Sequence, residues 1–109
     1  MIVEYTRYRI SPDRQAAFEQ AYGGAERYLK ASPHCLRYEL SRCMEEPESY
    51  VLRIEWVSLE DHLQGFRHEA GFADFFSLVR PFVSDIEEMQ HYEVTAVNGA
   101  RGVPPGSVE

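Results

Sequence analysis

YVLRIEWVSLEDHLQGFRHEAGFADFF, residues 50–76, decides the fold of this chain. Up to Trp56 the stretch alternates as a β-strand does, and both faces of that strand carry apolar side chains, which predicts that both are covered. Ser58 and an acid three residues later, Asp61, then have the form of a capping box, a pattern typical of a helix start. The stretch therefore predicts a strand that passes directly into a helix. The apolar stripe expected on this helix consists of Leu59, Leu63 and Phe66, with His62 on the same side.

Gly71 predicts a break in this helix. Beyond the glycine, apolar residues recur at helical spacing until Pro81 ends the segment. Aromatic residues at this spacing are typical of a packed core, but they also suit a flat apolar cleft, so both interpretations stay open. The residues of this second stripe are Phe72, Phe75, Phe76 and Val79.

Three further strands and one further helix are predicted outside this stretch. The helix begins at Ser11-Pro12, where a potential N-cap precedes proline, and ends at Ser32-Pro33. One predicted strand alternates clearly, with Leu36, Tyr38 and Leu40 on one face. The three strands are expected over residues 2–10, 35–44 and 86–97.

The resulting order, β-α-β-β-α-β, predicts an α+β, ferredoxin-like fold in which an antiparallel sheet carries both helices on one face. The other face of the sheet would be bare although it includes valine and tyrosine, so we expect a homodimer with two sheets packed face to face. Residues 1–97 form the predicted domain. Residues 98–109 have glycine and proline but no periodic apolar pattern, and we expect a flexible C-terminal tail there.

Composition excludes several classes of protein. With 109 residues, 44% hydrophobic and 13% aromatic, the chain suits one folded domain and is too apolar to be disordered. It has no apolar run of about 20 residues, so we expect no membrane span, and the charges close to Met1 argue against a signal peptide and favour the cytoplasm. A net charge of −7 without a basic cluster argues against a nucleic-acid partner.

Neither the cysteines nor the histidines predict a metal or redox site. Cys35 and Cys43 lie eight residues apart in one predicted strand, so at about 3.3 Å per residue they are too distant for a disulfide and should be free thiols. The four histidines show no metal-ligand spacing, and no glycine-rich phosphate loop follows a strand. We therefore expect no metal and no cofactor.

Taken together, these features resemble the antibiotic-biosynthesis monooxygenase family, small domains with the dimeric α/β-barrel fold. The similarity extends from Ile2 to Val94, and the element order and the third strand ending in Trp56 both match. The helix start at Ser58-x-Glu60 and the segment Phe72-x-x-Phe75-Phe76 match as well. The resemblance implies cofactor-independent oxygenation of polycyclic aromatic or quinone-like substrates, as in some members, or haem degradation, as in others.

The haem-degrading branch of the family differs from this chain at its reactive positions. That branch has an asparagine near the end of the first strand, a tryptophan in the second helix and a histidine further along it. The matching positions are Thr6, Phe66 and Phe76. Many members also have a histidine before the phenylalanine that matches Phe72, and here that position is Gly71. Haem degradation is therefore disfavoured.

His62 is the candidate general base, because it lies on the inward side of its helix and imidazole titrates near neutrality. The alternative is a hydrogen-bonded, partly buried histidine without a catalytic role. His91, on the last strand, faces either a cleft or the dimer interface. The expected lining of a substrate pocket is Thr6, Trp56, Phe66, Phe72 and Phe76.

Two functions from different classes stay open. One is a cofactor-independent monooxygenase that acts on a small aromatic or quinone-like substrate in an apolar cleft. The other is a non-catalytic dimeric module that binds a small molecule or has a regulatory role. The loss of polar residues at the family's reactive positions favours this second function.

Overall fold

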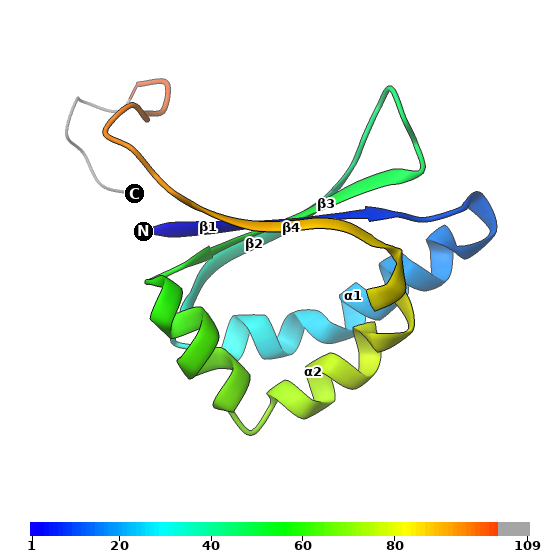
Figure 1. Ribbon diagram of the computed structural model, residues 1–109, viewed down its shortest axis with the longest axis horizontal. Coiled ribbons are helices and arrows are strands. Elements are labelled where there is room, and N and C mark those ends of the chain that lie inside the picture. The colour runs from blue at the N-terminus through cyan, green and yellow to red at the C-terminus, as the bar shows by residue number, and fades with distance from the viewer. Residues whose placement is uncertain (103–109) are drawn as a thin grey trace.

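The computed structural model describes residues 1–102 and contains a four-stranded antiparallel sheet with two α-helices on one face (Figure 1). The sheet order is β2-β3-β1-β4, so the first strand lies inside the sheet and pairs with both β3 and β4. This topology confirms the predicted α+β, ferredoxin-like fold, and the sheet is open rather than closed into a barrel. The strands are β1 (Ile2–Arg9), β2 (Cys35–Arg42), β3 (Ser49–Trp56) and β4 (Ile86–Glu93).

The first helix, α1 (Gln15–Ala31), starts three residues after the predicted proline. Pro12 instead opens a short 3-10 turn, η1 (Pro12–Arg14), and the side chain of Ser11 makes no capping hydrogen bond. The buried side chains of α1 recur at helical spacing and are Phe18, Tyr22, Ala25 and Leu29.

The second helical segment is divided into four pieces. It begins as predicted, because the N–H of Asp61 donates to Oγ of Ser58 at 3.0 Å. The predicted break at Gly71 is also confirmed, since a new helix starts at the next residue. The pieces are a π-helical turn η2 (Asp61–Gly65), a 3-10 turn η3 (Phe66–His68), the helix α2 (Phe72–Val79) and a 3-10 turn η4 (Arg80–Asp85).

Two residues predicted to lie on buried faces are exposed instead. Leu59 is 42% exposed, because the π-helical turn that follows changes the phase of the helix and directs His62 and Phe66 inward. Leu36 is 55% exposed, because the pairing of β2 with β3 shifts register between Cys35 and Arg37. A register shift of this kind moves a side chain to the other face of a strand.

The ends of two strands also differ from the prediction, since β2 stops at Arg42 and β4 at Glu93. After β4 the described chain has neither helix nor strand. The predicted flexible tail over residues 98–109 lies mostly outside the described residues, so that expectation stays a prediction. Within residues 1–102, no helix has both the length and the apolar character that a membrane span requires.

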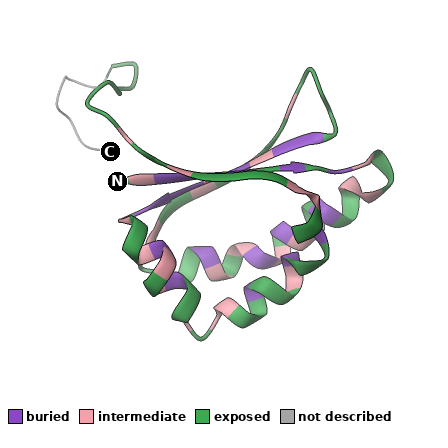
Figure 2. Cartoon of the chain, viewed as in Figure 1, coloured by how far each residue is buried: buried purple, intermediate pink, exposed green. Residues whose placement is uncertain are grey.

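The hydrophobic core lies between the helices and the sheet. Figure 2 shows buried positions on the sheet-facing sides of the helices and along β1 and β3, whereas β4 is exposed along most of its length. Both cysteines are free thiols, as predicted. Burial raises the pKa of Cys35 to about 11, so this thiol is protonated at neutral pH and is a poor nucleophile.

The opposite face of the sheet has no covering helix (Figure 1). Two tyrosines lie on it edge to face, Tyr5 and Tyr92, with exposures of 37% and 46%. Charged side chains on this face pair with each other, since Glu55 is 2.5 Å from Arg53 and 3.5 Å from Arg37.

Candidate functional site

A buried carboxylate, Glu4, is the centre of a hydrogen-bonded cluster between the sheet and the second helical segment. It lies in the inner strand β1 and is only 4% exposed. Its Oε1 accepts a hydrogen bond from Nε1 of Trp56 at 3.0 Å and lies 3.2 Å from Nε2 of His62. Its Oε2 accepts from Oγ1 of Thr6 at 2.8 Å. The donors around Glu4 offset much of the cost of burying a carboxylate.

His62 is stacked on Trp56, with ring centroids 4.5 Å apart and planes 6° from parallel. The side chain is buried, and this burial, with smaller electrostatic contributions from His91 and Arg67, lowers the pKa of His62 to about 4. The imidazole is therefore neutral near pH 7 and has one N–H. Because Nε2 faces the carboxylate of Glu4, we assign the hydrogen to Nε2, which leaves Nδ1 as an acceptor.

His91 continues this chain of hydrogen bonds toward the surface. Its Nε2 lies 2.7 Å from Nδ1 of His62, and in the pairing of β1 with β4 it stands opposite Glu4. Since Nδ1 of His62 accepts, Nε2–H of His91 must donate, and Nδ1 of His91 is then the basic nitrogen at the outer end. His91 is half-buried on an edge strand. The arrangement can take up a proton at His91 and stabilise the charge through His62 and Glu4, as in triads that orient a histidine with a buried carboxylate.

The π-helical turn η2 places His62 in this position. Its last hydrogen bond runs from the N–H of Phe66 to the carbonyl of Asp61, five residues earlier. Such turns are rare and occur often at functional sites, since they reorient side chains that an α-helix would direct elsewhere.

A second set of polar contacts holds the start of this turn. Nδ1 of His34 lies 2.6 Å from Oδ1 of Asp61, and the hydroxyl of Ser58 donates to Oδ2 at 2.8 Å. The hydrogen bonds from Ser58 and then His34 lower the pKa of Asp61. The ring of His34 also occupies the space beside Gly65, where a Cβ would lie 2.6 Å from Nε2. The connection between α1 and β2 is thereby attached to the segment that carries His62.

The predicted site residues fall into two groups. Thr6, Trp56 and His62 meet at Glu4, and Phe66 packs on Trp56 with ring centroids 5.2 Å apart. The other two lie further along a line of stacked and edge-on rings. Phe72 contacts Phe66 at 5.5 Å between centroids, and Phe76, which is 40% exposed, contacts Phe72 at 5.9 Å. These ring contacts are those of a packed core, one of the two interpretations that the sequence left open.

Two members of the cluster, Glu4 and His91, were not selected from the sequence. Glu4 shares a strand face with Thr6 and Tyr8, and a charged residue among inward positions is a signal that was present. For His91 the sequence allows either a cleft or the dimer interface, and strand register places it beside His62, on the side of the sheet that the helices cover.

Glu4, His62 and His91 also offer donor atoms of the kinds that bind metal ions, all within 4.8 Å of one another. Two ligands of one tetrahedral zinc ion lie roughly 3.3 Å apart, given bonds of about 2.0 Å. The 2.7 Å between the two imidazole nitrogens is shorter than this and equals a normal hydrogen bond. As arranged, the cluster fits a shared proton better than a cation.

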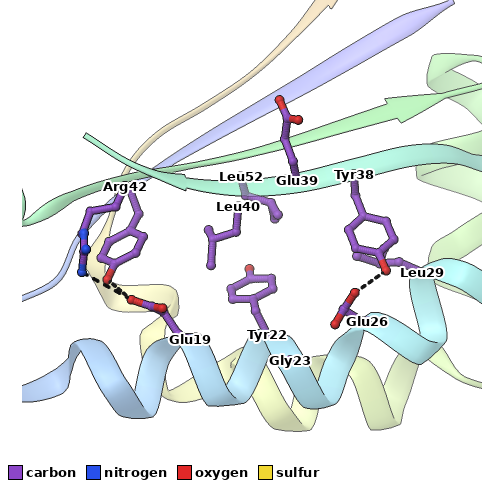
Figure 3. A pocket seen from close by; sticks show the side chains of 11 residues that line it. Glu19, Tyr22, Gly23, Glu26, Leu29, Tyr38, Glu39, Leu40, Arg42 and Leu52 are labelled. Atoms are coloured by element: carbon purple, nitrogen blue, oxygen red, sulfur yellow. Dashed lines mark hydrogen bonds and ion pairs between the residues drawn. The ribbon is translucent and has the colours of Figure 1, made fainter. Parts of the chain in front are cut away.

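At the other end of the core, a hollow of about 440 Å³ lies between α1 and the strands β2 and β3. In Figure 3, Tyr22 points from α1 toward Leu40 and Leu52, which form the apolar opposite wall. Leu52 and Trp56 lie in the same strand, four residues apart, or roughly 13 Å. The hollow is thus separate from the histidines.

Comparison with known proteins places this fold among oxygenase-like domains. The sequence model of a family described as antibiotic biosynthesis monooxygenase matches residues 1–78. An uncharacterized protein of Bacillus subtilis strain 168, YczJ, is 29% identical over 93 residues, which cover 85% of this chain and 98% of that protein.

Solved structures show the same fold. A protein of Bordetella bronchiseptica, provisionally named an antibiotic biosynthesis monooxygenase, superposes with a TM-score of 0.71 and 26% identity over 86% of this chain and 96% of that one. A protein of Deinococcus radiodurans with the same provisional name gives a TM-score of 0.70 over 94% of this chain and 100% of that one. Its identity is 14%, so this second likeness concerns the fold alone.

Proposed function

The chain belongs to the antibiotic biosynthesis monooxygenase family, and on that premise we propose that it is a cofactor-independent oxygenase whose base is the chain of Glu4, His62 and His91. The observation that carries this proposal is the continuous line of contacts from the buried carboxylate to the half-buried imidazole, with steps of 3.2 and 2.7 Å. A carboxylate behind two imidazoles is a costly arrangement in a core of this size. Its cost is understandable if it serves proton transfer.

In the proposed reaction, Nδ1 of His91 removes a proton from an acidic C–H group of the substrate. His62, the base expected from the sequence, and Glu4 position His91 and stabilise its positive charge. The substrate anion gives its electrons to dioxygen and forms a peroxide. The peroxide loses water, so that one oxygen atom remains as a new carbonyl and the other leaves as water. A CH₂ group and O₂ thus become C=O and H₂O.

The substrate class is a small aromatic compound whose anion is stabilised by delocalisation, such as an anthrone or a naphthol. An anion of this kind reacts with dioxygen without help from a metal or flavin. Apolar surface near the base supports this class, since Met89 precedes His91 by two residues on the same face of β4 and is 39% exposed.

Oxygen consumption tests the proposal directly. Wild type, His91→Gln and His62→Gln are assayed with a panel of anthrones, naphthols and naphthoquinols. We expect turnover by wild type and a fall in kcat of about 100-fold or more in both variants, with little change in KM. His68→Gln, which alters an exposed histidine close to the same turn, is the matched control and should keep wild-type rates. Absence of oxygen uptake across the panel would count against the proposal, as would full activity of His91→Gln.

A binding module without catalysis is the second candidate, and the hollow beside α1 favours it. The hollow lies in the size range of small-molecule sites but contains none of the histidines. For this function, the same aromatic panel should raise the melting temperature without oxygen uptake, because a ligand that binds only the native state stabilises it.

We also propose that the bare face of the sheet is the interface of a homodimer. A shallow depression there is lined by Tyr5, Arg7, Val51, Glu88 and Tyr92, a mixture of aromatic and charged groups that suits a self-complementary surface. Light scattering after size-exclusion chromatography should give twice the mass of the chain. Tyr5→Lys combined with Tyr92→Lys should give a monomer, and a monomeric wild type would refute the interface.

A further inference from the structure

The hollow between α1 and the outer strands is held open by two polar bridges. At one end, Tyr50 donates from its hydroxyl to Glu19 at 2.5 Å, and Arg42 lies 3.8 Å from the same carboxylate. At the other end, Tyr38 donates to Glu26 at 2.7 Å. In Figure 3 the two bridges lie on either side of Tyr22, and each connects α1 to a strand of the sheet. The helix is thereby connected to the strands at the ends of the hollow and not at its middle.

A glycine leaves the middle of the hollow empty. Gly23 lies on the wall formed by α1, and a Cβ at this position would meet no atom within 4 Å. Its neighbour Gly24 differs, because a Cβ there would lie 3.7 Å from Leu78 in α2. Gly24 therefore serves the packing of the two helices, whereas Gly23 borders open space.

The lining combines an apolar interior with carboxylates at the rim. Leu29, Leu40 and Leu52 supply the apolar surface, with the ring of Tyr22. Glu19 and Glu26 lie about two helical turns apart on α1, at opposite ends of the hollow (Figure 3). Glu39 belongs to the lining but points away from the space in Figure 3. The rim thus carries two carboxylates, and each has one exposed, weakly held cation, Arg42 at 3.8 Å from Glu19 and Lys30 at 3.6 Å from Glu26.

We propose that this hollow is a binding site for a small apolar amine. The apolar body of the amine lies against the leucines and Tyr22, and its ammonium group donates to Glu26 or Glu19 at the rim. A charged ammonium is favoured over a carboxylate because it pairs with these carboxylates, and the net charge of −7 acts in the same direction. The site is distinct from the histidine cluster, so this inference does not depend on the proposed oxygenase function.

Three probes of similar shape distinguish the contribution of charge to the binding affinity from that of apolar contact. These are 1-naphthylmethylamine, 1-naphthylmethanol and 1-naphthylacetate, titrated into the full chain by calorimetry at neutral pH. We expect the amine to bind at least 10-fold more tightly than the alcohol and the acetate not to bind. Equal affinity for all three probes, or no binding of the amine, would overturn the proposal.

Two variants locate the site. Gly23→Leu places a side chain in the open space and should abolish binding of the amine, while circular dichroism shows whether the helix is intact. Glu26→Gln alters a residue whose side chain is about half exposed, keeps its size, and should weaken binding of the amine about 10-fold while leaving binding of the alcohol unchanged. Glu60→Gln removes the same charge from an exposed position outside the hollow and is the control. An equal loss of affinity in Glu60→Gln and Glu26→Gln would mean that only the overall charge attracts the amine, which refutes the site.

Discussion

The two ends of the core differ in what fills them. At the end of β3 that contains Trp56, polar groups and aromatic rings are in contact, and Glu4, His62 and Phe66 are each less than 5% exposed. At the end that contains Leu52, a hollow of about 440 Å³ lies between helix and sheet, and none of the histidines lines it. One end has groups capable of proton transfer within tight packing, and the other has space without such groups.

The two ends also differ in the surroundings of their glycines. Gly65 is required at the packed end because the ring of His34 occupies the position of its missing side chain. Gly23 at the hollow end has no such neighbour. The same residue type therefore permits close contact in one region and borders open space in the other.

The largest expected effect concerns the packed end. Phe66→Ala removes a ring that contacts Trp56, Phe72 and Phe75, and no neighbour can easily fill the cavity. We expect a loss of about 3–5 kcal/mol in the free energy of unfolding, measured by urea denaturation. Phe76→Ala, at an exposed ring, is the control and should cost less than about 1 kcal/mol. Equal losses would show that the packed end is not tightly filled.

The next effect is a pH dependence that originates in His62. Its pKa is about 4 in the folded chain against a usual value of 6.5, so the unfolded chain binds a proton between these values and the folded chain does not. Stability should therefore fall as the pH drops, by about 2 kcal/mol between pH 7 and pH 5. Urea denaturation of His62→Gln should show a correspondingly smaller loss over this range. An identical pH profile for wild type and variant would contradict the buried, neutral histidine.

A smaller destabilisation is expected for Gly65→Ala. The new Cβ would lie 2.6 Å from the ring of His34, which must move and weaken its hydrogen bond to Asp61. We expect the free energy of unfolding to fall by about 1–2 kcal/mol, measured by thermal or urea denaturation. When His34→Ala is already present, Gly65→Ala should lower the free energy of unfolding much less. An equal loss with and without His34 would exclude the contact with His34 as the cause.

The smallest effect has the opposite sign. Gly23→Ala, inside α1, meets no atom and replaces glycine by a better helix former, so stability should rise by about 0.5–1 kcal/mol. Gly23→Ala and Gly65→Ala, measured in the same denaturation series, compare the two ends with one substitution. A destabilised Gly23→Ala would show that the hollow is filled in solution.

The fold was predictable because local signals were sufficient for it. Alternation in β3, the capping box at Ser58 and the break at Gly71 each predicted an element boundary, and the order of elements then indicated the topology. The π-helical turn was not predictable, since the capping box begins an α-helix and a π-turn equally well. The exposure of Leu59 is a consequence of that turn.

The site was predictable only in part. His62 and Trp56 lie in one continuous stretch, so their proximity could be inferred from the sequence. The position of His91 beside them depends on the pairing of His91 with Glu4, and register between strands distant in the sequence cannot be read from one chain. The hollow was missed for another reason. Two adjacent glycines in a helix do not reveal which of them has a close neighbour, and in this structure Gly24 has one and Gly23 does not.

The π-helical turn has a consequence for insertions and deletions in related chains. A π-turn contains one residue more than the α-helical turn it replaces, and one residue corresponds to about 100° of rotation in an α-helix. Deleting a single residue between His62 and Phe66 would leave them three residues apart in a regular α-helix, a spacing that still places both side chains on one face. A homologue that is one residue shorter at this point can therefore still share the cluster around Glu4, so an alignment should allow a gap within Asp61–Gly65.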